Sequence, residues 1–262
     1  MTGVFASSPN SDFRGRGVFV SGGTSGIGAA VARAFAAAGA NVVIFGRRAE
    51  AAEKVVTGIR SAGGSCEFVS GDIRNSEDIE RAIDIAVNNG GLRAAVNSAG
   101  IFDRFVGIRN YSEEQWDEMI ATNLTGVFRC LRAEMAAMAG HGGAIVNIGS
   151  SVGHRGSLRA SPGYVAAKHG VLGLTRQCAL ECAGENIRVN SVSPGPTATD
   201  MAAPLVAEGP DVVRATIGSL NPTGRFVDPD VVAAAVLYLC SSAAEGINGA
   251  DLAIDGGQLA KL

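Results

Sequence analysis

Two side chains with complementary proton chemistry lie four residues apart in the segment Tyr164-Val-Ala-Ala-Lys168. In an α-helix, residues i and i+4 share a face, so the lysine ammonium can lie beside the tyrosine phenol. A free tyrosine has a pKa of about 10 and exchanges its proton poorly near neutrality. A neighbouring cation stabilises the phenolate and lowers that pKa, so the pair could act as a general acid or base. Tyrosine and lysine also occur at this spacing by chance, so the surrounding motifs decide the interpretation.

A glycine-rich segment, Ser21-Gly-Gly-Thr-Ser-Gly-Ile-Gly28, lies between a predicted strand and a predicted helix. Its spacing is G-x-x-x-G-x-G. Glycines without side chains let the backbone approach a pyrophosphate at the positive N-terminus of a helix. The alternative is a plain strand–helix turn, but the required strand and helix both flank the loop. The segment therefore predicts a dinucleotide site.

Two arginines, Arg47 and Arg48, follow the second predicted strand, where an acid would bind the adenosine 2′-hydroxyl of NAD. Guanidinium groups instead pair with a 2′-phosphate, which favours NADP and leaves NAD as the alternative. One of the two arginines could simply be the solvated start of the next helix. Ser150 and Ser151 add hydroxyl groups at the end of a later apolar run, at the mouth of the same predicted cleft.

The elements that must position these residues alternate between short β-branched runs and longer amphipathic stretches. Apolar runs without alternation indicate strands covered on both faces, as in a parallel sheet. Strands are predicted at 18–21, 41–45, 65–69, 94–97, 144–148, 188–192 and 252–254. Helices are predicted at 27–38, 49–62, 77–88, 112–138, 164–182 and 228–239. This order predicts one doubly wound α/β domain, of Rossmann type, over residues 1–262, with a central parallel sheet of about seven strands flanked by helices.

Two segments fall outside this alternation. Residues 1–13 lack the basic start and apolar run of a secretory signal, and we expect a loose N-terminal arm. Residues 200–225 form the long irregular insertion, punctuated by prolines, and we expect a substrate lid there. Its apolar residues suit a hydrophobic or ring-bearing substrate better than a sugar.

Composition and charge exclude several classes of protein. The 36 glycines among 262 residues show no collagen period, and the formal net charge of −3 lacks a basic block for nucleic acid. The longest uncharged apolar run, Val231–Cys240, is too short to span a bilayer. Five cysteines without metal-ligand partners predict buried or spare thiols, no metal site, and a reducing cytoplasm.

Taken in order, these motifs resemble the short-chain dehydrogenase/reductase family in its short single-domain form, and more narrowly a 3-oxoacyl reductase-like member. The resemblance extends from Gly15 to Gly257. Besides the motifs above, it depends on Gly71-Asp72-Ile73, Asn97-Ser-Ala-Gly100, Thr122-Asn123-Leu-Thr-Gly-Val-Phe128, Asn190-Ser-Val-Ser-Pro-Gly195, Thr199 and Asp255-Gly-Gly257.

The resemblance implies a catalytic tetrad of Asn123, Ser151, Tyr164 and Lys168. Tyr164 would be the general acid when a carbonyl is reduced and the base when an alcohol is oxidised. Ser151 would hold the substrate oxygen. Lys168 would lower the tyrosine pKa and bind the nicotinamide ribose, and Asn123 would position a water that links Lys168 to solvent. Asn123 could also be an ordinary amide inside a helix.

The resemblance also implies a cofactor groove. Asp72 and Ile73 would flank the adenine, Asn97 would line the groove, and the loop 194–199 would meet the carboxamide. The predicted cofactor-binding residues are Gly22, Thr24, Ser25, Gly26, Ile27, Gly28, Arg47, Arg48, Asp72, Ile73, Asn97, Ala99, Gly100, Tyr164, Lys168, Pro194, Gly195, Thr197 and Thr199.

The chain departs from the family pattern at two positions that matter. Ser98 stands where the family usually has a second asparagine, and Ser25 lacks the basic side chain that many NADP-using members carry. The prediction of NADP therefore depends on Arg47 and Arg48 alone. After Ser151, the rim residues Arg155 and Arg159 could recognise a carboxylate or phosphate, or could simply be solvated.

Together these features predict an NAD(P)-dependent oxidoreductase that interconverts a carbonyl and a secondary alcohol, with NADPH-dependent ketone reduction favoured. Its partner would be a small-molecule carbonyl or alcohol, with neither nucleic acid nor membrane, and the resemblance implies a homo-oligomer, a tetramer or dimer. The alternative is a nucleotide-binding regulatory or scaffolding protein of the same fold without turnover.

Overall fold

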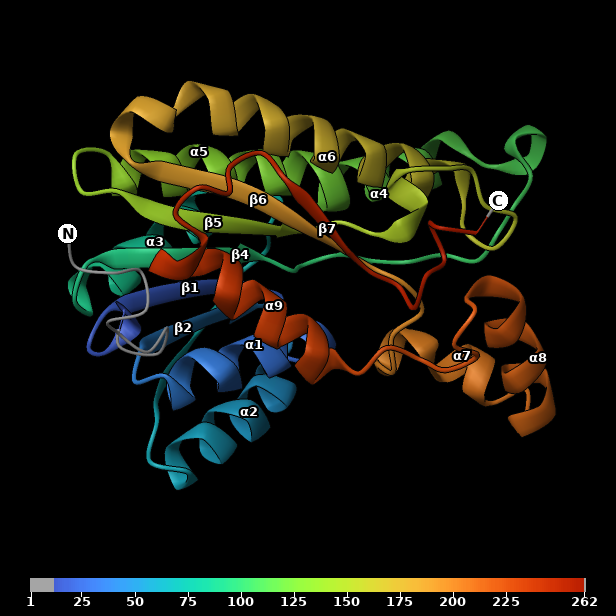
Figure 1. Ribbon diagram of the computed structural model, residues 1–262, viewed down its shortest axis with the longest axis horizontal. Helices are drawn as coiled ribbons and strands as arrows, with labels where there is room; N and C mark the ends of the chain where they lie inside the picture. Colours follow the sequence, from blue (N-terminus) through green and yellow to red (C-terminus); the bar gives the residue numbers. More distant parts are fainter. Residues whose placement is uncertain (1–11, 262) are drawn as a thin grey trace.

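Seven parallel strands form the centre of the molecule, in the order β3-β2-β1-β4-β5-β6-β7 (Figure 1). The computed structural model describes residues 12–261. The strands are β1 (Gly17–Ser21), β2 (Asn41–Gly46), β3 (Ser65–Ser70), β4 (Leu92–Asn97), β5 (Gly143–Ile148), β6 (Ile187–Pro194) and β7 (Asp251–Ile254). The predicted doubly wound sheet of about seven strands is confirmed. All residues of β1 and β5 are buried, as expected for strands covered on both faces.

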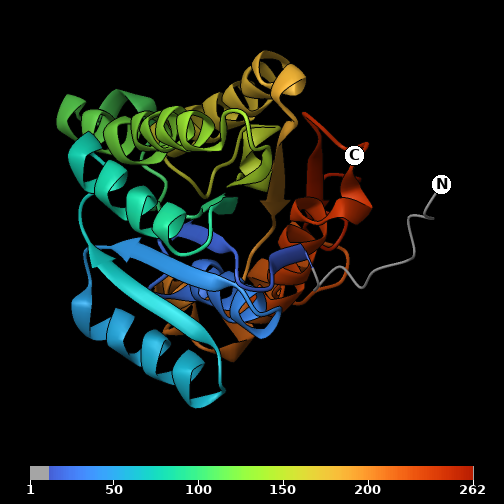
Figure 2. The same ribbon diagram turned by 90° about the vertical axis from the view of Figure 1, so that its left-hand side faces the viewer.

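Helices cover both faces of the sheet (Figures 1 and 2). One apolar core lies under α1, α2 and α9, and the other lies under α3, α5 and α6. The helices are α1 (Gly26–Ala37), α2 (Ala49–Ser61), α3 (Ser76–Asn88), α4 (Glu113–Ile120), α5 (Gly126–Met138), α6 (Pro162–Glu181), α7 (Ala203–Val206), α8 (Pro210–Leu220) and α9 (Pro229–Cys240). Shorter turns are η2 (Ile108–Asn110), η3 (Ala121–Thr125), η4 (Ser151–Gly153), η5 (Ala183–Glu185), η6 (Asp200–Ala202) and η7 (Ser242–Ala244).

The strand order reverses between β1 and β4, both of which lie in the middle of the sheet. In an open parallel sheet, ligands bind in the crevice beyond the carboxyl ends of the strands at such a reversal. The loops after β4 and β6, together with α7 and α8, lie at this edge, on the right of Figure 1. The fold therefore brings the predicted site segments to one edge, called the carboxyl edge below.

The predicted continuous helix 112–138 is wrong in one respect. The stretch begins as α4, passes through the π-helical turn η3 (Ala121–Thr125), and continues as α5. Asn123 lies in this turn, where its side chain bonds to another segment, as described below. π-helical turns are rare and concentrate at functional sites, and apolar spacing gives no sign of one.

The predicted irregular insertion 200–225 is also corrected, because it contains η6, α7 and α8. Two of the prolines that suggested loop structure, Pro204 and Pro210, lie in the first turns of α7 and α8. Proline is favoured there because its missing N–H has no helical partner to bond. The excursion is closed at its base, where the Val227 N–H donates to the Pro196 carbonyl at 2.8 Å. This segment, residues 199–226, is called the lid below after its expected role, which stays a prediction.

The prediction of a loose arm over residues 1–13 is wrong for Phe13. Phe13 is fully buried and packs edge-on against Phe35, with 4.9 Å between the ring centroids. Residues 1–11 lie outside the described part of the chain. All five cysteines are buried free thiols, as predicted.

Two features are absent from the described residues 12–261. None of their helices combines the length and apolar character that a membrane span requires. Within the same range, no three His, Cys, Asp or Glu side chains come together as potential metal ligands.

Candidate active site

Helix α6 positions Tyr164 and Lys168 at the carboxyl edge. Ser161 caps the start of this helix, because its hydroxyl accepts the Tyr164 N–H at 3.2 Å. Both functional side chains are buried, and the Lys168 ammonium lies 5.7 Å from the centre of the tyrosine ring. The ammonium donates to the Ile148 carbonyl, the last of β5, at 2.7 Å. The structure thus brings the predicted pair together beside the end of a central strand.

Burial controls the proton affinity of this pair. It raises the pKa of Tyr164 to about 12, although the Ser150 hydroxyl opposes the shift. It also lowers the pKa of Lys168 to about 8. Both shifts have one cause, because a low-dielectric interior disfavours the charged phenolate and the charged ammonium alike. The pKa of Tyr164 is therefore raised by burial rather than lowered as expected, so the phenol keeps its proton at neutral pH.

Ser151 begins the short turn η4 directly after β5 and is almost fully buried. Its hydroxyl donates to Oε1 of Gln258 at 3.1 Å. Gln258 belongs to the C-terminal segment, which Asp255 shapes by accepting the N–H groups of Gly257 and Leu259. The motif Asp255-Gly-Gly257 was noted in the sequence, but its role in bringing Gln258 to the serine was not predicted.

Asn123 lies fully buried in the π-helical turn η3, which packs against α6. Its side-chain amide exchanges two hydrogen bonds with the backbone of Ile101, each 2.8 Å long. The turn therefore fixes the loop that follows β4. The predicted role of Asn123 in holding a water near Lys168 stays a prediction. All four predicted catalytic residues lie at the carboxyl edge.

The glycine loop at the start of α1 is held by close backbone packing. A Cβ on Gly22 would lie 2.6 Å from the Cα of Ala99, and one on Gly28 would lie 2.3 Å from the Gly22 carbonyl oxygen. Gly22 also has φ +68°, which favours glycine. A side chain at Gly22 would push the loop away from the segment after β4, and one at Gly28 would push α1 away from the loop.

The loop borders a cavity of about 850 Å³ lined by Thr24, Ser25, Gly26, Arg48 and Thr199, among others. Ser25 precedes α1, and its side chain does not cap the first N–H groups of this helix. Such N–H groups bind phosphate oxygens well. The residues present therefore fit the pyrophosphate of a dinucleotide, with Ile27 on the first turn of α1.

The two arginines after β2 have different surroundings. Arg48 donates to the hydroxyls of Ser25 and Thr24, and its guanidinium lies 3.9 Å from the Asp200 carboxylate at the start of the lid. Arg47 is exposed and lies near Asp72. A hydrogen bond from Arg74 lowers the pKa of Asp72, and the positive charge of Arg47 contributes. Arg48 thus joins the glycine loop to the lid.

The predicted adenine and groove residues also differ in their surroundings. The Asp72 carboxylate accepts from Arg74 at 2.6 Å, and the Ile73 side chain is buried in the core below α5. The Asn97 side chain points into the interior, where it donates to Asn147 at 3.0 Å. The Asn97 side chain therefore does not face the groove. That its backbone lines the groove stays a prediction.

The loop after β6 closes against the glycine loop. A Cβ on Gly26 would lie 3.0 Å from Cγ2 of Thr199, and one on Gly195 would lie 2.8 Å from the Cα of Asp255. The Thr197 hydroxyl donates to the Gly195 carbonyl at 2.9 Å. On the other side, a Cβ on Gly100 would lie 3.2 Å from Oδ1 of Asn123. The predicted residues Pro194, Gly195, Thr197, Thr199, Ala99 and Gly100 therefore lie at the same edge as the glycine loop.

A buried polar network lies beneath the site. Glu134 of α5 is fully buried, and its Oε2 accepts from the Asn97 amide at 3.0 Å. The network continues from Asn97 to Asn147, and from Asn147 to the Thr175 hydroxyl at 2.9 Å. Burial raises the pKa of Glu134 to about 8. The network joins β4, β5, α5 and α6. Glu134 was not among the residues predicted from the sequence to belong to the site.

The rim residues that follow Ser151 differ in their contacts and in their exposure. His154 lies 2.7 Å from the Asp251 carboxylate of β7, so its ring is attached to the sheet edge. Arg155 is half-buried and Arg159 is exposed. Recognition of a substrate anion by either arginine stays a prediction.

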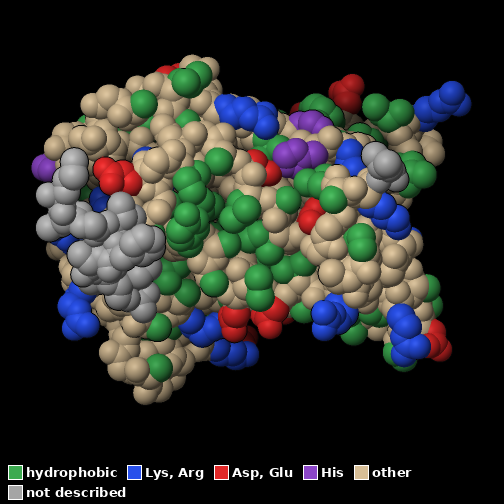
Figure 3. Space-filling model, viewed as in Figure 1, with side chains coloured by type: hydrophobic (Ala, Val, Ile, Leu, Met, Phe, Trp, Pro, Cys, Tyr) green, Lys and Arg blue, Asp and Glu red, His purple; other side chains and the backbone are tan. Residues whose placement is uncertain are grey.

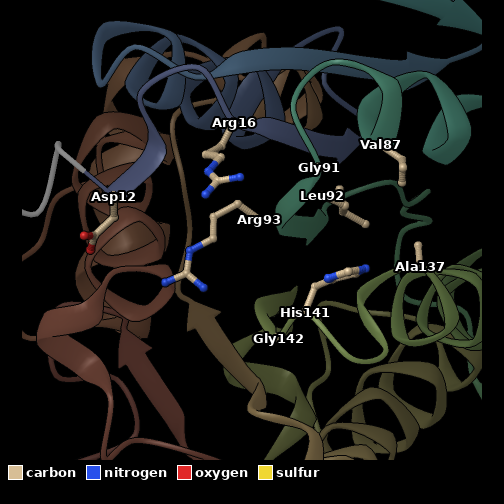
Figure 4. Close-up of a pocket in the computed structure, with 9 residues that line it drawn as sticks. All are labelled: Asp12, Arg16, Val87, Gly91, Leu92, Arg93, Ala137, His141 and Gly142. Atoms are coloured by element: carbon tan, nitrogen blue, oxygen red, sulfur yellow. The ribbon is translucent and has the colours of Figure 1, made fainter.

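A separate cavity of about 570 Å³ lies at the amino edge of the sheet (Figure 4). Arg16, Arg93 and His141 are among its lining residues. Arg16 donates to the Gly90 carbonyl just beyond the end of α3, at 3.3 Å. A cation is favourable at the C-terminus of a helix, which accounts for this contact. The cavity contains none of the predicted site residues.

A family model described as enoyl-(acyl carrier protein) reductase matches residues 22–258 of this chain. The chain belongs to the short-chain dehydrogenase/reductase family. The resemblance noted from the motifs is thereby confirmed. As a short-chain dehydrogenase/reductase, it is an oxidoreductase that acts on alcohol or carbonyl groups.

Two named relatives are similar over almost the whole chain. The cis-4-hydroxycyclohexanecarboxylate dehydrogenase of Sinomonas cyclohexanicum is 40% identical, with 95% of this chain and 98% of that protein covered. The cyclohexanol dehydrogenase of Acinetobacter sp. (strain SE19) is 39% identical, with 95% and 97% covered. Among solved structures, a putative 2-deoxy-D-gluconate 3-dehydrogenase from Agrobacterium tumefaciens with bound NADP has a TM-score of 0.87 and 35% identity, with 97% and 100% covered.

Proposed function

We propose that this short-chain dehydrogenase/reductase interconverts a ketone and a secondary alcohol, with NADPH-dependent ketone reduction as the favoured direction. The observation that carries the proposal is the buried Tyr164–Lys168 pair beside Ile148, at the edge where Ser151 and Asn123 also lie. Acid–base chemistry at a carbonyl oxygen needs a proton donor and a nearby cation that compensates the charge left behind.

In this proposal Tyr164 is the acid in ketone reduction. Because burial raises its pKa to about 12, its hydroxyl is protonated at neutral pH and can donate to the substrate oxygen. Ser151, whose hydroxyl now donates to Gln258, would turn that donor toward the same oxygen. Lys168 would stabilise the phenolate that the transfer leaves on Tyr164. In alcohol oxidation the same groups act in reverse, with Tyr164 as the base.

The cofactor proposed is NADP, with NAD as the alternative. When bound, its nicotinamide supplies the hydride donor or acceptor. The N–H groups at the start of α1 would hold the pyrophosphate, and Arg47, exposed at the end of β2, would pair with a 2′-phosphate. The related structure with bound NADP supports this choice.

The substrate proposed is a small apolar ketone or alcohol. Its support is the exposed apolar surface of the lid, where Met201, Val206 and Val212 are accessible, and the ring-bearing substrates in the names of the two relatives. We also propose a cytoplasmic homo-oligomer, a tetramer or dimer. Exposed Trp116 on α4 and Phe128 on α5 support an apolar contact between copies, measurable by light scattering.

Substitution Tyr164→Phe tests the proposal. We expect it to lower kcat by about 10²–10⁴-fold, the usual contribution of a positioned proton donor, while NADPH binding and the unfolding transition stay unchanged. The absorbance of the reduced nicotinamide is followed with a panel of ketones and alcohols. The matched control is Tyr238→Phe, at an exposed tyrosine of α9. NADPH binding without turnover of any substrate by the unmodified protein would favour the regulatory alternative.

A further inference from the structure

One aromatic ring stands beside the catalytic tyrosine. Phe102 lies edge-to-face with Tyr164, with ring centroids 5.1 Å apart and an angle of 87° between the ring planes. The tyrosine is buried, whereas 39% of Phe102 is exposed. The exposed part of the Phe102 ring is therefore available to a ligand that approaches Tyr164.

The residues on either side hold Phe102 in place. The backbone of Ile101 is fixed by the Asn123 amide. The Asp103 carboxylate accepts from the Tyr111 hydroxyl at 2.8 Å, and the Arg104 guanidinium lies 3.2 Å from the Glu208 carboxylate of the lid. Arg104 and one carboxylate oxygen of Asp103 are thus engaged by other residues, whereas Oδ1 of Asp103 is buried without a hydrogen-bond partner among the described residues. The ring itself is what this segment offers beside Tyr164.

The lid supplies apolar surface at the same edge. Its segment follows β6, and the segment of Phe102 follows β4, so both leave the carboxyl ends of parallel strands. Met201 and Val206 are 47% and 54% exposed, and the pair Arg104–Glu208 joins the two segments. Figure 3 shows hydrophobic side chains between charged ones at the end of the molecule that carries α7 and α8. Large exposed apolar side chains beside a catalytic group favour an apolar ligand.

We infer that Phe102 determines the substrate preference of this site, as the wall against which a saturated carbon ring that carries the reacting carbon packs. The inference rests on the proposed function. A ring carbinol presents only C–H groups to the aromatic wall. A hydroxylated open chain would leave its hydroxyl groups without hydrogen bonds there, at a cost that excludes it.

The test compares substrates rather than rates alone. Cyclohexanol, butan-2-ol and threitol are assayed with the unmodified protein and with Phe102→Ala, and binding of cyclohexanol is measured separately by saturation-transfer NMR. We expect Phe102→Ala to lower kcat/KM for cyclohexanol about tenfold, the usual scale for an apolar pocket contact, mostly through KM. Turnover of butan-2-ol should change less than about threefold, within the effect of a marginal contact.

Two further variants keep the result interpretable. Phe105→Ala removes another exposed aromatic ring from the same loop and should leave the preference unchanged. Phe102→Leu retains apolar bulk, should fold where alanine does not, and should lose less discrimination. Equal losses on the ring and open-chain alcohols, or a preference for threitol in the unmodified protein, would overturn the inference and leave the proposed function intact. Failure to oxidise or reduce any substrate would overturn the proposed function itself.

Discussion

Two parts of the carboxyl edge contrast in how they are built. In the glycine loop 22–28, backbone meets backbone, with hypothetical Cβ atoms on Gly22 and Gly28 less than 3 Å from main-chain atoms. The segments 101–110 and 199–226 instead expose large side chains such as Phe102, Ile108 and Met201. One part fixes a backbone shape that suits a constant ligand. The other presents a surface that substitution can change.

The glycine loop therefore depends on the fold, whereas the side chains of the other two segments can be substituted without disturbing it. A dinucleotide has the same pyrophosphate in every member of the family, so a loop built from close backbone contacts serves all of them. Substrates differ, and side chains on loops can be exchanged without disturbing the sheet. We therefore expect substitutions in the glycine loop to affect folding and cofactor binding together. Substitutions in the substrate segments should affect selectivity.

The largest effect is expected for Gly28→Ala. A Cβ at Gly28 would lie 2.3 Å from the Gly22 carbonyl oxygen, and neither backbone segment can move without separating α1 from the loop. The free energy of unfolding should fall by about 3 kcal/mol, the upper range for overpacking, and NADP binding should weaken. Urea unfolding and cofactor titration measure both.

The matched control is Gly58→Ala in α2, where a Cβ meets no atom of the described residues within 4 Å. Alanine is favoured over glycine inside a helix, so this variant should be more stable by about 0.5–1 kcal/mol. Equal stability of the two variants would contradict the claim that close backbone packing holds the glycine loop.

A second prediction concerns the buried network between these parts. Burial raises the pKa of Glu134 from 4.5 to about 8, so the folded protein holds one proton more than the unfolded chain between those pH values. Stability should therefore fall as pH rises through this window, by about 1.4 kcal/mol per pH unit. The nearby titratable groups are the thiols Cys130 on the same helix and Cys178 on α6, whose pKa values burial also raises.

Glu134→Gln keeps the shape and the acceptor for Asn97 but cannot ionise. Between pH 6 and 7.5 its stability relative to the unmodified protein should rise by about 2 kcal/mol, from the same linkage. Glu77→Gln, in the first turn of α3, is the control. Parallel curves for Glu134→Gln and the unmodified protein would mean that the carboxyl group is ionised in the folded state.

The smallest effect of the three is expected for Arg47→Ala. The exposed guanidinium near Asp72 is the group proposed to pair with a 2′-phosphate, so NADP affinity should fall about tenfold while NAD affinity stays nearly constant. Arg176→Ala, at an exposed arginine of α6, is the control. Equal losses for both cofactors would assign Arg47 a role other than selecting the phosphate.

Much of the cofactor part could be predicted, because its signals are local. The glycine loop with its flanking strand and helix, and Tyr164 with Lys168 on one helix, each lie within a short stretch of chain. Local patterns of this kind follow directly from strand and helix periodicity. The doubly wound parallel sheet followed from the alternation of strands and helices, whereas the strand order was not predicted.

The residues that were missed depend on contacts between distant segments. Gln258 reaches Ser151 across 107 positions, and Phe102 meets Tyr164 from a loop in which the neighbouring Ile101 is bonded to Asn123. Glu134 looks like an ordinary polar position of a surface helix, and only the packed sheet shows that it is buried. The prolines led to a wrong prediction for the lid. Proline breaks a helix in its interior but is favoured in the first turn, where Pro204 and Pro210 lie.

The π-helical turn η3 also sets the phase of the helices that flank it. A π turn closes its hydrogen bonds over one residue more than an α turn. Each residue of an α-helix turns the chain by about 100°, so α4 is rotated by roughly that angle from where an unbroken helix would place it. The buried positions of α4 and α5, such as Met119 and Leu131, therefore do not fit one continuous helical periodicity. The same turn contains Asn123, whose side-chain amide donates to the Ile101 carbonyl.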